Sequence, residues 1–71
     1  MSGSLPPHVR LANEISAQFA HRPPQAAATA VANHIKAVWD PRMKAALVAH
    51  AASGATDLDP IAALAAQQLT P

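Results

Sequence analysis

Four histidines are the residues of this 71-residue chain best suited to acid–base chemistry or metal binding. They are His8, His21, His34 and His50, at least thirteen residues apart, so no two stand on adjacent turns of one helix. No cysteine and no nearby carboxylate pair completes a metal site around any of them. We therefore expect no metal ion, a polar contact for His34 and His50 on apolar helix faces, and solvation of His8 and His21.

The acidic residues have a structural explanation in place of a catalytic one. They are Glu14, Asp40, Asp57 and Asp59, and no two have the helical spacing of a dicarboxylate metal site. Asp40 and Asp59 each precede a proline, the arrangement expected of a helix N-cap followed by proline at the first helical position. With two glycines in all, the chain has no glycine-rich phosphate loop. We expect no catalytic and no cofactor-binding residue in this chain.

The segment Trp39-Asp40-Pro41-Arg42-Met43 is the most informative part of the sequence. It predicts the end of one helix at Trp39 and the start of another at Pro41, with an aromatic residue at the corner. Arg42 falls in a first helical turn, where the helix dipole disfavours a cation, so we expect a carboxylate partner within the chain or on another protein. Trp39 fits two interpretations: a central core residue, or an interface anchor, since Trp and Arg dominate binding hot spots.

The elements that position these residues are all predicted to be helices. Leu11, Ile15 and Phe19 recur at i, i+4 and i+8, and similar apolar stripes follow each later proline start, whereas no sustained alternation predicts a strand. We expect an all-α fold, a small bundle of three to four short helices with Asp-Pro helix starts. The helices are predicted at about 6–20, 24–38, 41–53 and 60–69. Residues 1–5 are expected to be a disordered lead-in, and residues 6–71 a single small helical domain.

The composition predicts a marginally stable domain that gains stability by oligomerisation or by docking on a partner, with an autonomous small bundle as the alternative. Nineteen of the residues are alanine, which favours helix but buries little area, and no cysteine is present to form a disulfide. A net charge of +1 from scattered basic residues argues against nucleic-acid binding. No apolar run approaches the ~20 residues of a membrane span. We expect a cytoplasmic protein that contacts neither nucleic acid nor membrane.

Several short motifs follow one another along the chain: LANEI at 11–15 followed by Phe19, ANHI at 32–35, WDPRM at 39–43 and LDP at 58–60. Together they resemble one family, the delta subunit of cytoplasmic NAD-dependent, molybdenum-containing formate dehydrogenase. The resemblance covers roughly residues 11 to 65 and is most specific at its centre. Glu14 stands where the family often has Gln, and Val38 where an aromatic residue is common.

The resemblance implies a non-catalytic accessory subunit that docks on the catalytic alpha subunit and supports molybdenum cofactor insertion or complex stability. In that complex the alpha subunit is expected to hold molybdenum bis-guanine-dinucleotide and iron–sulfur clusters, while beta and gamma subunits pass electrons to FMN and NAD. An alternative is a transient chaperone-like or regulatory helical module that is not a resident subunit. Carried over by position, the expected partner-binding residues are Asn13, His34, Trp39, Arg42 and Met43.

Overall fold

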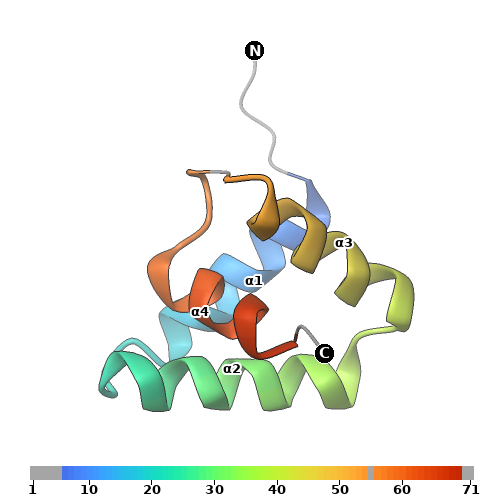
Figure 1. Ribbon diagram of the computed structural model, residues 1–71. Helices are drawn as coiled ribbons and strands as arrows, with labels where there is room; N and C mark the ends of the chain where they lie inside the picture. The colour runs from blue at the N-terminus through green and yellow to red at the C-terminus, as the bar shows by residue number, and fades with distance from the viewer. Residues whose placement is uncertain (1–5, 55, 70–71) are drawn as a thin grey trace.

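Four helices make up the computed structural model, which describes residues 6–54 and 56–69. They are α1 (Pro7–Gln18), α2 (Pro24–Val38), α3 (Pro41–Ala52) and α4 (Pro60–Leu69). The prediction of a small all-α bundle is confirmed (Figure 1). The predicted disorder of residues 1–5 lies outside the described residues.

Each helix begins with a proline, and the two Asp-Pro starts have the predicted cap. The Asp40 carboxylate accepts a 2.8 Å hydrogen bond from the Met43 backbone N–H, and Asp59 accepts one of 2.8 Å from the Ile61 N–H. The helix dipole also favours a carboxylate at these positions. These caps fix where α3 and α4 begin, and therefore the direction in which each leaves the preceding corner.

The ends of α1 and α3 differ from the predicted ones by one or two residues. α1 stops at Gln18 because the N–H groups of Phe19 and Ala20 bond three residues back, to Ser16 and Ala17, which tightens the last turn. α3 stops at Ala52, and Gly54 follows with a φ of +80°, a left-handed conformation that glycine adopts without strain.

The core lies mainly between α2 and α4, which pack against each other more extensively than any other pair of helices in the described part of the chain. In Figure 1, α2 runs along the base, with α4 above it and α1 and α3 completing the bundle. Leu11 and Ile15 of α1 and Met43 of α3 pack against this centre and stay partly exposed, whereas Leu47 of α3 is fully buried. Because the central side chains are small, the helices approach closely, but the buried apolar area stays modest. The core residues are Ala12, Ala28, Val31, Ala32, Ile35, Trp39, Leu47, Ala62, Ala65 and Ala66.

Candidate partner-binding surface

Trp39 lies at the α2–α3 corner and belongs to the core. Only 9% of its surface is exposed, because its backbone is extended after α2 and turns the side chain back onto the bundle. The core interpretation of Trp39 is therefore confirmed. Its remaining exposed edge nevertheless lines a groove at the surface, so the residue also contributes to a possible contact face.

That groove, which we call the corner groove, is formed by α1, the end of α2 and the start of α3. Its volume is about 520 Å³, within the range of binding clefts in proteins. Val38 stands at its edge with 64% of its surface exposed, the one large apolar side chain in the described residues that is so exposed. The lining residues are Leu11, Glu14, Ile15, Gln18, His34, Val38, Trp39, Asp40 and Met43. Three of the predicted partner-binding residues, His34, Trp39 and Met43, thus come together here.

Arg42 lies beside this groove, on a ridge formed by Asp40, Pro41 and Arg42 that also borders a smaller hollow. Its side chain is exposed and has no carboxylate within ion-pair distance among the described residues. The Asp40 carboxylate next to it is engaged by the Met43 N–H. Of the two sources we expected for a partner carboxylate, the described part of the chain provides none.

Asn13, the fifth predicted residue, is placed away from the corner groove and holds the bundle together. Its side-chain amide donates to the Asp57 backbone carbonyl at 3.0 Å and accepts from the Asp59 backbone N–H at 2.8 Å. It therefore ties α1 to the connector between α3 and α4. This internal contact gives a structural reason for an asparagine at this position, and contact with a partner protein by Asn13 stays a prediction.

Replacing Asn13 by alanine is expected to destabilise the bundle by about 1–3 kcal/mol, because the part-buried Asp59 N–H loses its acceptor. Urea denaturation followed by circular dichroism measures the change. Asn33→Ala is the matched control, since Asn33 is exposed on α2 and makes no side-chain hydrogen bond in the described structure. Equal urea midpoints for Asn13→Ala and Asn33→Ala would show that the two side-chain hydrogen bonds of Asn13 contribute nothing to stability.

The histidines separate into two environments. His34 is exposed at the corner groove and its side chain makes no hydrogen bond or ion pair among the described residues, so the polar contact expected for it is absent there. His21 is exposed as expected. His50 bonds through Nε2 to the Asp57 carboxylate at 2.7 Å, and this contact lowers the pKa of Asp57 below its ordinary value. His8 packs edge-on against His50 with ring centroids 5.7 Å apart and is half-buried. The prediction was that His8 is solvated, and it is only partly so.

These polar contacts fasten the connector between α3 and α4. The Ser53 hydroxyl donates to the His50 carbonyl at 2.6 Å, which directs it away from the imidazole. In residues 6–54 and 56–69 no three histidine or carboxylate side chains are grouped closely enough to hold a metal ion. Within the same ranges, no helix has the length and apolarity needed to cross a membrane.

The sequence did not predict the contacts among His8, His50 and Asp57. It also did not predict the two hydrogen bonds of the Asn13 side chain. Both join residues more than forty positions apart or on separate elements, and no local pattern marks such pairs. The corner groove was found only in part: the motif indicated His34, Trp39 and Met43, but not the α1 wall of Leu11 and Ile15.

The geometry defines a small helical protein with a groove of mixed apolar and polar lining at a helix corner. Comparison with protein families then gives a match over residues 8–66 to the family described as the NADH-dependent formate dehydrogenase delta subunit, FdsD. The match covers most of the chain, and the chain belongs to this family. No curated protein and no solved structure matches it significantly.

Proposed function

We propose that this chain is a non-catalytic accessory subunit that docks on the catalytic alpha subunit of a cytoplasmic formate dehydrogenase. Membership of the delta-subunit family supports a place in that enzyme. The observation that carries the docking proposal is the corner: a groove with apolar and polar lining, an exposed Val38 and an Arg42 without a carboxylate partner in the described chain. Aromatic and arginine anchors in a cleft, surrounded by apolar contacts, are typical of interface hot spots.

The thin core supports the same proposal. A domain of this size rarely gains more than about 3–5 kcal/mol from its own core, and here much of that core is alanine. A partner that binds only the folded state adds stability by mass action. In this proposal, docking adds the stability that the small core does not provide. The molybdenum cofactor, iron–sulfur clusters, FMN and NAD are proposed to be held by the alpha, beta and gamma subunits.

The role in the complex is proposed to be cofactor insertion or complex stability. The direct test is co-purification of the tagged chain with the alpha subunit, and a chain that always elutes alone would contradict docking. Stoichiometry then separates the two forms of the proposal. One copy for each alpha subunit in the active enzyme indicates a resident subunit, whereas absence from the active enzyme indicates a chaperone-like module that leaves after assembly.

Arg42→Ala is expected to weaken association with the alpha subunit by about 1–3 kcal/mol, because an interface arginine paired with a carboxylate loses that contact. Helix content should not change, since the Arg42 side chain is exposed. Biolayer interferometry with the purified alpha subunit measures the affinity. Arg22→Ala is the control, because Arg22 is exposed over the Phe19 ring, away from the corner. Equal affinities for Arg42→Ala and the unmodified chain would remove Arg42 from the interface.

A further inference from the structure

A second groove lies on the other side of the corner ridge, between α3 and the ends of α2 and α4. We call it the α3–α4 groove. Its volume is about 560 Å³, and five of its lining residues are apolar: Pro41, Ala45, Val48, Ala49 and Leu69. Pro41 borders both this groove and the hollow beside Arg42, so the ridge separates it from the corner groove.

The α3–α4 groove exists because α3 has two apolar faces. Leu47 is completely buried against the bundle, whereas Pro41, Ala45 and Val48 recur at i, i+4 and i+7 on a different side of the helix. On that side Ala45 and Ala49 are exposed. In a helix that buries one stripe, the other positions are normally polar. An apolar second face is therefore a feature that the fold itself does not require.

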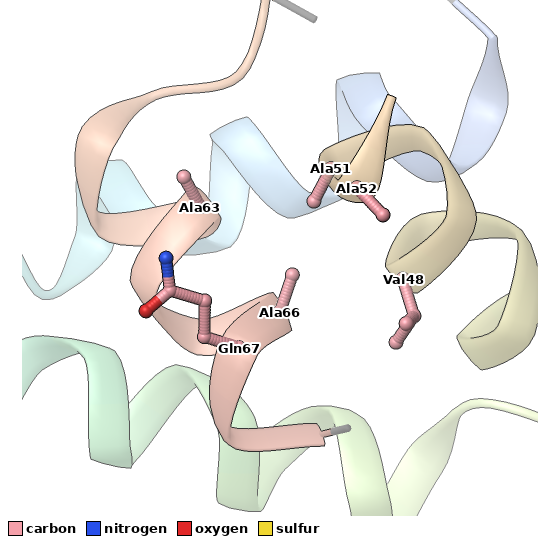
Figure 2. A pocket seen from close by; sticks show the side chains of 6 residues that line it. All are labelled: Val48, Ala51, Ala52, Ala63, Ala66 and Gln67. Carbon is pink, nitrogen blue, oxygen red and sulfur yellow. The ribbon is translucent and has the colours of Figure 1, made fainter. Parts of the chain in front are cut away.

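The groove continues along α3 into a smaller depression, shown in Figure 2, which is lined by three residues of α3 and three of α4: Val48, Ala51, Ala52, Ala63, Ala66 and Gln67. Val48 lines both hollows, so they form one track along the helix. Most side chains along it end in a methyl group. Such a surface lets a second helix pack closely, with an interaxial distance of about 8–10 Å.

The charges at the two grooves differ in sign. Lys36 and Lys44 stand in the lining of the α3–α4 groove, and no carboxylate lies within ion-pair distance of either in the described residues. The Lys44 side chain is half-buried, which places its aliphatic stem along the wall and its ammonium group at the rim. The corner groove instead contains the carboxylates of Glu14 and Asp40. An occupant of the α3–α4 groove must therefore bring negative charge.

We infer that the α3–α4 groove binds an acidic amphipathic helix of a partner polypeptide, with apolar side chains against Ala45 and Val48 and carboxylates at Lys36 and Lys44. A second copy of this chain placed symmetrically on the same face would bring lysines against lysines, which disfavours a dimer there. The inference rests on the proposed function, because the partner helix belongs to the formate dehydrogenase complex.

Reversal of one rim charge tests the inference. Lys44→Glu is expected to raise the Kd for the purified enzyme complex at least about tenfold at low salt, and less at high salt, because rim charges act through screened attraction. Arg22→Glu makes the same charge change outside both grooves and should leave the Kd unchanged. If neither variant changes the Kd while the unmodified chain binds, the inference is overturned and the proposed function stands. If the unmodified chain does not bind, the proposed function fails first.

A second measurement does not depend on a charge substitution. A photo-crosslinking amino acid at Ala45, which is exposed in the groove, should attach in the assembled complex to a partner helix that carries several Asp or Glu residues. Mass spectrometry identifies the attached peptide. Attachment to a second copy of this chain, attachment to a segment without carboxylates, or no product from an intact complex would each overturn the inference.

Discussion

Trp39→Ala is expected to leave much of the isolated chain unfolded at 25 °C. Trp39 is 9% exposed and joins the core cluster from the corner between α2 and α3. Removal of a buried tryptophan side chain costs about 3–5 kcal/mol, and the core of a domain this small contributes about the same. The core residues around it are mostly alanine and cannot expand to fill the space. Circular dichroism at 222 nm during urea denaturation measures the loss.

Two comparisons make this prediction specific. Trp39→Phe keeps an aromatic ring in place and should retain a cooperative unfolding transition, although at a lower midpoint. Addition of the alpha subunit to Trp39→Ala should recover helical signal in proportion to its concentration, because a partner that binds the folded state shifts the equilibrium toward it. If the variant melts cooperatively with the midpoint of the unmodified chain, Trp39 is not the centre of the core.

The helices could be predicted closely because each boundary depends on local chemistry. Proline at the first helical position, an aspartate cap and a glycine with positive φ act over one turn, so the sequence shows them directly. The predicted start of α3 at Pro41 and of α4 at Pro60 agree with the structure. The errors were at α3, which ends one residue early, and at α1, whose last turn tightens into i→i+3 hydrogen bonds that no residue type at 19 or 20 indicates.

The tertiary contacts were less predictable, because they join residues far apart in the chain. Asn13 was assigned to a partner surface on the strength of the family motif, but its amide bridges to the backbone of Asp57 and Asp59. A family motif does not show whether a residue serves the fold or the binding of a partner. For Trp39 the sequence left both interpretations open, and only the packing showed that the residue is buried while one edge lines a groove.

The arrangement of side chains by size connects the fold to the proposed docking. Alanines occupy the centre between α2 and α4, while Leu11, Ile15 and Met43 stay partly exposed around the corner groove. A chain selected only to fold alone would place its larger apolar side chains in the centre, where they bury the most area. Under the docking proposal, the alpha subunit would cover these side chains, while Ile35 and Leu47 are already fully buried in the bundle.

Val38→Asp is expected to abolish co-purification with the alpha subunit while the bundle stays folded. Val38 is 64% exposed in the isolated chain, so a carboxylate there remains solvated and costs little stability. In the complex the same position is proposed to be buried at the edge of the corner groove, where an unpaired carboxylate is strongly unfavourable. We expect a loss of about 3 kcal/mol or more, which corresponds to about 100-fold in Kd.

Ala37→Asp is the matched control for this experiment, because Ala37 is exposed on the same last turn of α2 but does not line the corner groove. Both substitutions place a negative charge near a helix C-terminus, so the helix dipole disfavours them equally. A difference in affinity between Val38→Asp and Ala37→Asp therefore measures contact at the corner groove and not a change in the stability of α2. Affinities for Val38→Asp and Ala37→Asp that both equal that of the unmodified chain would place the alpha subunit on a different face of the bundle.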